Sequence, residues 1–273
     1  MAKTDIGKLF CKGILVFDGA MGTMIQSMGL RPGDSPDSWC LVNPAAVAEV
    51  HRRYVDSGCM GPLGSLVEPL GDVTFEEAYE AFAAQAAAFA EGEPDFIIID
   101  TIADLNEMRA AILACKDKAP GIALITQMTL ERSMRSFTGT PPEAAGLVMQ
   151  SMGADVVGFN CSVGPDLMTE AVRRLAAVAR VPVSVQPNAG MPRLTRDGRT
   201  EFPMGPEEFA SYGPKLVAAG ASIVGGCCGT TPEHVRLLRG AVEGLPARTI
   251  PSGAPAPASQ GGFSIRALTE DVP

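Results

Sequence analysis

Short apolar segments rich in β-branched residues recur along the chain, and most are followed by a stretch with helical periodicity. Each segment ends in small or polar residues, which is typical of buried strands that lead into loops. Alternation of such strands with helices favours an α/β fold whose parallel sheet is covered by helices. The segments are Ile14–Phe17, Phe96–Ile99, Ile122–Met128, Asp155–Phe159, Pro182–Val185 and Ser222–Val224.

Helix start signals lie between these segments. Thr74 and Glu77 have the spacing of a capping box, and apolar residues then recur at helical spacing from Phe75 to Phe89. Asp104 with Glu107 repeats the signal, and Pro follows Thr at positions 140–142 and 231–232. The repeated order of strand, loop and helix predicts an α/β fold of the (β/α)8 TIM-barrel type rather than a doubly wound sheet.

The number of strand candidates is smaller than the number of strands in a closed barrel. Between Ile14–Phe17 and Phe96–Ile99 the sequence predicts a helix at about Pro44–Ser57, a weak strand at Cys59-Met60 and the helix that begins at Phe75. This gives seven strand candidates in all, where a closed barrel has eight. We therefore expect residues 1–250 to form a barrel that lacks one βα unit.

The last residues differ in composition from the rest. From Pro251 the chain is rich in Pro, Gly, Ser and Ala, as linkers are. We expect residues 251–273 to be a tail or a connection to a further domain.

Composition narrows the class of protein. Apolar residues make up 46% of the 273 residues and charged residues 19%, which excludes wholesale disorder. The formal net charge of −9 disfavours binding to nucleic acid. No apolar run is long enough to span a membrane, and the first residues do not resemble a signal peptide, so we expect a cytoplasmic protein.

Two carboxylates follow predicted strands, where barrel enzymes carry their active sites. Asp18 opens the segment Asp18-Gly19-Ala20-Met21-Gly22-Thr23, whose small residues allow backbone N–H groups to approach an anion. Asp100 follows Phe96–Ile99. Taken alone, an ordinary tight turn at Asp18 or a helix-capping role for Asp100 would explain either residue. Together the two acids could bind a substrate ammonium.

Three of the seven cysteines also follow predicted strands. Cys161 comes after Asn160 at the end of one strand, and Cys227-Cys228 lies between glycines after another. Three thiolates with an open fourth position describe a catalytic zinc site. A buried, inert Cys161 is the alternative for that residue. The remaining cysteines, which we expect to be structural, are Cys11, Cys40, Cys59 and Cys115.

The ligand set indicates the chemistry. Three anionic sulfur ligands make zinc a weak Lewis acid, so the site suits activation of a thiol substrate better than activation of water. Beside an ammonium-binding carboxylate pair, this indicates alkyl transfer to the sulfur of an amino-acid thiol. A zinc-free thiol hydrolase is a weaker reading, because neither His51 nor His234 follows a strand and no GxSxG or HExxH motif occurs.

These motifs resemble the zinc-dependent homocysteine S-methyltransferase family over about residues 10–245, most closely the N-terminal homocysteine domain of cobalamin-dependent methionine synthases. The segment Gly225-Gly226-Cys227-Cys228-Gly229 is the most specific of them. The others are Asp18–Thr23, Glu68-Pro69-Leu70-Gly71-Asp72, Gly158-Phe159-Asn160-Cys161 and Gln186-Pro187-Asn188-Ala189-Gly190.

The resemblance implies roles for individual residues. Cys161, Cys227 and Cys228 would hold zinc, and Asn188 would take the fourth position until homocysteine sulfur replaces it. Asp18 and Asp100 would face the substrate amino group, although the family usually has Glu at the position of Asp100. The other implied substrate-binding residues are Gly19, Ala20, Met21, Gly22, Thr23 and Asn160.

The resemblance also implies which βα unit is missing and which methyl donor the reaction uses. Relative to the family, the chain lacks the second strand and the helix that follows it. The implied reaction is methyl transfer to homocysteine, giving methionine, with methylcobalamin as donor on a partner protein or module, because no Asp-x-His-x-x-Gly motif for cobalamin occurs here. Betaine or S-methylmethionine is a less favoured donor. The competing hypothesis is a zinc-binding scaffold domain of the same family that has lost catalysis.

Overall fold

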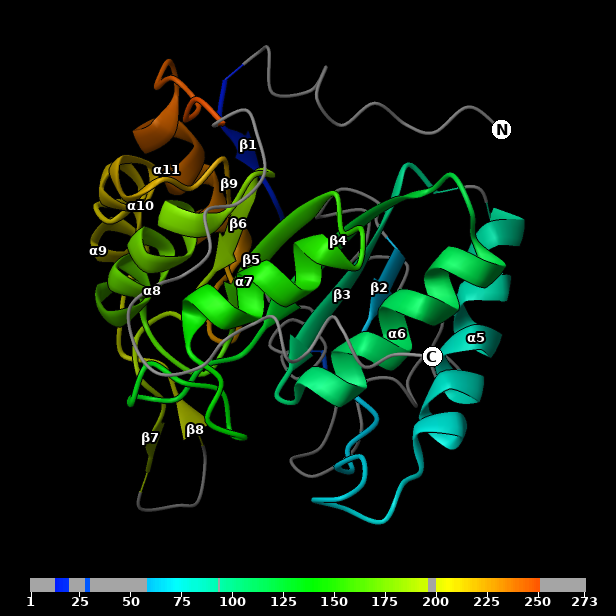
Figure 1. Ribbon diagram of the computed structural model, residues 1–273. Coiled ribbons are helices and arrows are strands. Elements are labelled where there is room, and N and C mark those ends of the chain that lie inside the picture. The colour runs from blue at the N-terminus through cyan, green and yellow to red at the C-terminus, as the bar shows by residue number, and fades with distance from the viewer. Residues whose placement is uncertain (1–12, 20–27, 30–57, 93, 196–199, 251–273) are drawn as a thin grey trace.

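A computed structural model describes residues 13–19, 28–29, 58–92, 94–195 and 200–250. Within them, strands and helices alternate as the sequence predicts (Figure 1). The strands of the main sheet are β1 (Leu15–Val16), β2 (Gly58–Met60), β3 (Phe96–Ile102), β4 (Ala123–Met128), β5 (Val156–Asn160), β6 (Val183–Gln186) and β9 (Ile223–Val224). The helices are α5 (Phe75–Gly92), α6 (Leu105–Lys118), α7 (Pro142–Ser151), α8 (Pro165–Val178), α9 (Pro206–Ala210), α10 (Gly213–Ala219) and α11 (Pro232–Val242).

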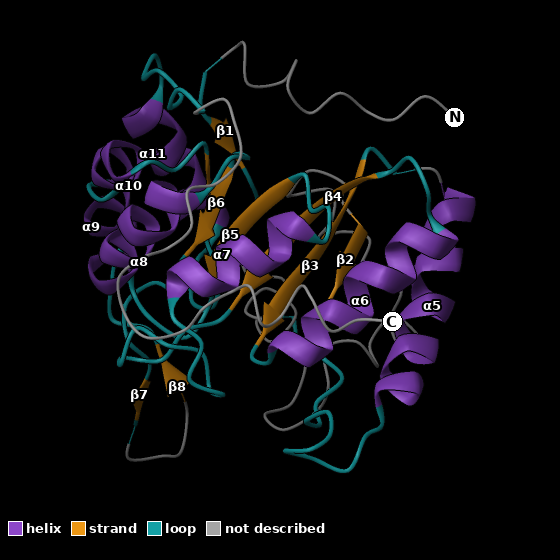
Figure 2. Ribbon diagram, viewed as in Figure 1, coloured by secondary structure: helices purple, strands orange, loops and turns teal. Residues whose placement is uncertain are grey.

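All seven predicted strands are present in one parallel sheet. Their order is β1-β9-β6-β5-β4-β3-β2, so the first strand pairs with the last, as it does in a barrel. The sheet curls, and the helices cover its outer side (Figure 2). This confirms an α/β fold with a partial TIM-barrel sheet.

The two edges of the sheet are β1 and β2, which do not pair with one another among the described strands. The predicted loss of one βα unit concerns the chain between these two strands. Of that chain the structure describes only residues 17–19 and 28–29, and the predicted helix at Pro44–Ser57 lies outside the described residues.

The predicted helix starts are also present. Thr74 and Glu77 form the capping box, since the backbone N–H of each donates to the other's side chain over 2.9 and 3.2 Å. Asp104 caps α6 by accepting from the N–H groups of Asn106 and Glu107. At α7 the cap differs from the expectation, because Pro141 occupies the N-cap and provides no side-chain hydrogen bond.

Side-chain alternation along the strands separates two core layers. Ile97 and Ile99 of β3, like Val157 and Phe159 of β5, pack outward against the helices. Ile98, Ile125, Val156 and Ile223 meet inside the curl of the sheet. Farther along these strands, at their carboxyl ends, the inner positions become polar. They are Asp100, Gln127, Asn160 and Gln186.

The inner face of the described sheet is therefore polar toward the carboxyl ends of these strands, where Gln127 also donates to the buried Ser184 hydroxyl. In Figure 1 the arrow of β3 points toward the side from which a small antiparallel hairpin projects. The sequence did not predict this hairpin, which consists of β7 (Arg193–Leu194) and β8 (Thr200–Glu201). Among the described helices, none is long and apolar enough to cross a membrane.

Candidate metal and substrate site

The three cysteines predicted to bind metal come together at the carboxyl ends of β5 and β9. The Sγ atoms of Cys161, Cys227 and Cys228 all lie within 4.8 Å of one another. Cys161 Sγ and Cys228 Sγ are 3.7 Å apart. Two sulfur ligands on one tetrahedral zinc ion would be about 3.8 Å apart, given Zn–S bonds of about 2.3 Å. The cluster therefore has the dimensions of a zinc site.

Backbone hydrogen bonds between three loops hold the cysteines in place. Cys161 N–H donates to Gln186 over 3.0 Å, and Cys227 N–H donates to Pro187 over 2.8 Å. Ala189 N–H donates to the carbonyl of Cys228 over 2.9 Å. The loop after β6 thus lies between the loops after β5 and β9 and is bonded to both.

Glycine is required beside the paired cysteines. Gly229 has φ of +81°, and a Cβ there would lie 2.3 Å from the side chain of Phe202. A Cβ on Gly226 would lie 2.5 Å from the side chain of Thr230. These two positions tolerate no side chain without a shift of their neighbours, so the tight turn that presents both thiols depends on them.

The three cysteines of the cluster differ in the pKa of their thiols. Hydrogen bonds from the thiols of Cys227 and Cys228 lower the pKa of Cys161 to about 3, aided by the Ser162 N–H and by Asn188. The same interaction with Cys161 raises the pKa of Cys228 to about 12 and raises the pKa of Cys227 as well. The cluster without a cation thus holds one thiolate and two thiols.

Asn188 provides a second observation that fits a metal site. Its side chain is buried, and its Oδ1 atom has no hydrogen-bond partner among the described residues. A buried amide oxygen without a partner is costly, and a cation beside the three sulfur atoms would supply one. The donor set of three thiolates and one amide oxygen fits zinc.

Asp100 and Asn160 form a polar cluster next to the cysteines. Asn160 Nδ2 donates to Asp100 Oδ2 over 3.0 Å and to Thr101 Oγ1 over 2.7 Å, and it lies 3.8 Å from Cys227 Sγ. The Thr101 N–H donates to Asn160 Oδ1 over 2.7 Å. Asp100 lies inside β3, which runs to Ile102, so the expectation that the strand ends before Asp100 is wrong. An irregularity in the β3–β4 pairing between Ile99 and Ile102 accommodates it.

Asp18 reaches the cluster from β1. Its Oδ1 atom accepts a hydrogen bond from Gln186 Nε2 over 3.1 Å, and its backbone carbonyl accepts from Gly226 over 2.9 Å. Burial raises the pKa of Asp18 to about 6, the hydrogen bond from Gln186 opposes this shift, and the charge of Asp100 adds to it. Burial also raises the pKa of Asp100. Of the predicted carboxylate cradle only Gly19 is described, since Ala20, Met21, Gly22 and Thr23 lie outside the described residues.

Several features of the site were not predicted from the sequence. Gln186 belongs to a motif that the sequence singled out, but it was given no role. Thr101, Cys161 and Ser162 have left-handed backbones with φ near +60° (62°, 61° and 59°), a conformation that is rare for these residues and typical of functional sites. The Ser162 hydroxyl is hydrogen-bonded to Thr129 at the end of β4. Backbone conformation cannot be read from these residue types, so the sequence carried no signal for these three left-handed conformations.

The other cysteines divide into different environments. Cys115 is buried in the outer core, as expected of a structural cysteine, and burial raises its pKa to about 12. Cys59 is exposed, and its thiol donates to Asp100 Oδ1 over 2.9 Å. Cys11 and Cys40 lie outside the described residues. His234 is part of the cap of α11, where its Nδ1 accepts from the Thr231 N–H.

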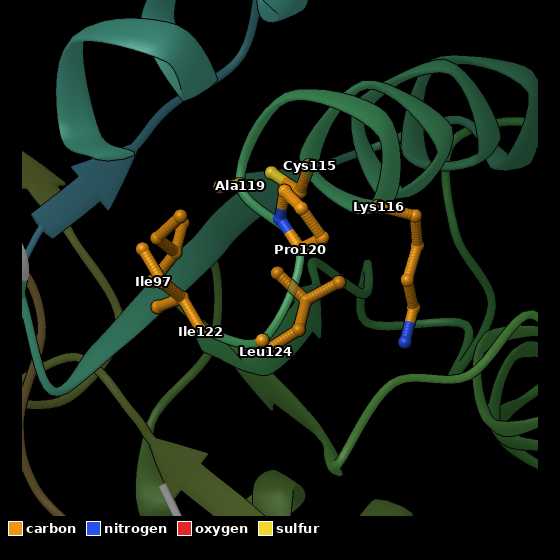
Figure 3. A pocket seen from close by; sticks show the side chains of 8 residues that line it. Ile97, Cys115, Lys116, Ala119, Pro120, Ile122 and Leu124 are labelled. Atoms are coloured by element: carbon orange, nitrogen blue, oxygen red, sulfur yellow. The ribbon is translucent and has the colours of Figure 1, made fainter. Parts of the chain in front are cut away.

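Two hollows lie away from the cysteines. One is small and lies at the amino ends of β3 and β4, between Ile97, Ile122, Leu124 and the end of α6 (Figure 3). Barrel chemistry takes place at the opposite end, so this hollow is not a candidate active site. The other is larger and open and lies beside the β7–β8 hairpin, with Asp166, Arg193 and Glu208 in its wall.

The chain belongs to the homocysteine S-methyltransferase family. The sequence model of that family, described as Homocysteine S-methyltransferase, matches residues 15–60 and 57–242. The chain is 36% identical over 208 residues to a methionine synthase of Mycobacterium leprae, and 37% identical over 199 residues to one of Mycobacterium tuberculosis. These matches cover 74% and 71% of the chain but 17% and 16% of the relatives, so the chain spans about a sixth of their length.

Solved structures agree on the fold. The homocysteine methyltransferase MmuM from Escherichia coli, in its apo form, has a TM-score of 0.66 at 19% identity, covering 87% of this chain and 98% of that one. Its metallated form has a TM-score of 0.62 at 21% identity, covering 86% and 98%. A pyruvate carboxylase from Rhizobium etli has a TM-score of 0.52 over 88% of this chain and 26% of its own, at 11% identity.

Proposed function

We propose that this chain transfers a methyl group to the thiol of homocysteine, giving methionine, with zinc held by Cys161, Cys227 and Cys228. The single observation that carries the proposal is the cluster of three Sγ atoms within 4.8 Å at the carboxyl ends of parallel strands, in a chain of this family. When bound there, zinc would favour the thiolate form of a substrate thiol near neutral pH.

The chain's own residues would bind and orient the substrate. Asp18 and Asp100 provide two carboxylates for the homocysteine ammonium, and Asn160 connects Asp100 to the cysteine cluster through its amide. The backbone from Gly19 to Thr23 is proposed to bind the substrate carboxylate. Asn188 is proposed as the fourth ligand in the absence of substrate, which its unpartnered Oδ1 supports.

In the proposed reaction the substrate sulfur attacks the methyl carbon of the donor. A lone pair of sulfur forms the new S–C bond, while the electron pair of the broken bond stays with the donor. The similarity to methionine synthases, of which the chain spans about a sixth, supports a methylcorrinoid donor on a partner protein or a further domain.

We place the catalytic unit in residues 1–250 and regard 251–273 as a linker or tail. A cytoplasmic location remains part of the proposal.

We also propose that one βα unit, the second strand and its helix, is absent. Two observations support this: the family model matches in two segments that share residues 57–60, and the described β1 and β2 form opposite sheet edges. In a complete barrel a further strand would pair with both of these edges.

Homocysteine binding to the zinc-loaded protein tests the proposed function. We expect about one zinc per chain and release of about one proton per homocysteine at pH 7, because the thiol loses its proton at the metal. The product of turnover with a methylcorrinoid protein is then measured as methionine. Stoichiometric zinc with no proton release on adding homocysteine would support the scaffold alternative instead.

A further inference from the structure

The thiol of Cys59 contacts a carboxylate of the proposed substrate site. Its Sγ donates to Asp100 Oδ1 over 2.9 Å, although the two residues are 41 positions apart. Cys59 belongs to the edge strand β2 and has no place in the cluster of three sulfur atoms. This contact distinguishes it from Cys115, which is buried among apolar side chains of the outer core.

The strand register accounts for the contact. Cys59 is the parallel partner of Ile98 in β3, and partners in adjacent strands point to the same face of the sheet. Ile98 and Asp100 are two residues apart and therefore share that face. Since Ile98 packs inside the curl of the sheet, Cys59 and Asp100 both face the inner side, near its carboxyl end.

Protein donors reach both oxygens of the Asp100 carboxylate. Oδ2 accepts from Thr101 Oγ1 over 2.9 Å and from Asn160 Nδ2 over 3.0 Å. Oδ1 accepts from Cys59, the one donor to it that the described residues show. Without that thiol the carboxylate would be held through Oδ2 alone and could rotate about its last bond. The direction in which the Asp100 carboxylate points toward a ligand thus depends on the donors to both of its oxygens.

We propose that Cys59 is a positioning residue of the substrate site, whose thiol fixes the Asp100 carboxylate so that it can bind the ammonium of the amino-acid thiol. This inference rests on the proposed function. In this role Cys59 acts through Asp100, so its replacement should weaken the binding of ligands that carry an amino group and leave the binding of others unchanged.

The binding test compares two ligands and two variants of the zinc-loaded full chain. Homocysteine and 4-mercaptobutanoate, which lacks the amino group, are titrated by calorimetry into the wild type, Cys59→Ala and Cys59→Ser. We expect Cys59→Ala to raise the Kd of homocysteine about tenfold, the size of one lost hydrogen bond to a charged group. The Kd of 4-mercaptobutanoate should stay the same, and Cys59→Ser, which keeps a donor, should bind homocysteine within about threefold of the wild type.

Other outcomes contradict the inference in distinguishable ways. If Cys59→Ala weakens both ligands equally, the residue has only a structural role. If it weakens neither, Cys59 positions nothing. If the wild type itself does not bind homocysteine, the proposed function fails together with this role, and that result is seen before any variant is made.

A second measurement tests the contact without any substrate. Iodoacetamide reacts with the thiolate form of cysteine, and a neighbouring carboxylate opposes formation of that thiolate. We expect Asp100→Asn to speed alkylation of Cys59 about tenfold, followed by mass spectrometry of its tryptic peptide. Cys115 should stay unmodified in both proteins and so report that the fold is intact. An unchanged rate at Cys59 would show that the contact with Asp100 is absent in solution.

Discussion

Cys161 Sγ and Cys228 Sγ lie 3.7 Å apart, although 67 positions separate the two residues in the chain. The contact joins the ends of β5 and β9, which are not neighbours in the sheet because β6 lies between them. The loop after β6 bridges the gap through its bonds to both cysteine loops. The geometry of this site is therefore a property of three loops together.

Replacement of one cysteine of the cluster should remove the metal. We expect Cys228→Ser to lower zinc content from about one per chain to a small fraction, because a hydroxyl is a poor ligand beside two thiolates. Metal content after dialysis against a weak chelator measures this. Cys115→Ala, outside the cluster, is the matched control and should keep its zinc. Full zinc content in Cys228→Ser would contradict the ligand assignment.

Zinc binding should release a number of protons that depends on how many of the three cysteines are already ionised. At pH 7 Cys161 is ionised in the apo cluster, while Cys227 and Cys228 hold their protons. Binding of zinc by three thiolates should therefore release about two protons, and affinity should fall about a hundredfold for each unit of decreasing pH near neutrality. A zinc titration in weak buffer with a pH indicator gives the number. Release of three protons would mean that no preformed thiolate exists.

Asp18 should make folding stability depend on pH in a defined window. Because its pKa is about 6 in the folded protein and 3.8 ordinarily, the folded state binds its proton more tightly. This contribution favours the folded state at low pH and is lost as pH rises from about 4 to 6, by about 3 kcal/mol in total. Asp18→Asn should abolish it.

Urea unfolding at pH 4 and pH 7 measures this effect as the difference between Asp18→Asn and the wild type. Asp95→Asn removes an exposed carboxylate at the amino end of β3 and serves as the control. Relative to the wild type, Asp18→Asn should gain stability at pH 7 and not at pH 4. Equal gains at both values would mean that burial does not disfavour the Asp18 charge.

Glycine-to-alanine substitutions should have opposite effects on stability in the cysteine turn and in helix α11. We expect Gly229→Ala to destabilise the fold by about 2 kcal/mol and to reduce zinc content, because the left-handed backbone and the side chain of Phe202 both oppose a Cβ. Gly240→Ala is the matched control. That glycine lies in α11 with open space around it, and alanine should stabilise the helix by up to about 1 kcal/mol. Thermal unfolding and metal analysis of both variants distinguish them.

The sequence by itself determined the order of strands and helices in the described chain. Apolar β-branched runs marked every strand of the main sheet except β2, because buried strands carry a pattern that needs no knowledge of neighbours, and β2 was indicated only weakly by Cys59-Met60. Thr74 and Asp104 marked their helices because capping is a local interaction between residues two or three positions apart. The hairpin of β7 and β8 was missed, since its short strands are exposed and carry no buried apolar run.

The candidate site was predicted in its chemistry and not in its geometry. Residue types and their places after strands were enough to single out Cys161, Cys227, Cys228, Asp18 and Asp100 as candidates, because parallel strands end at one edge. That Cys59 bonds to Asp100, that Gln186 holds Asp18, and that Thr101 and Cys161 adopt left-handed backbones depended on the tertiary structure. These features arise from the register between strands and from contacts across loops, which are interactions between distant residues that no local pattern encodes.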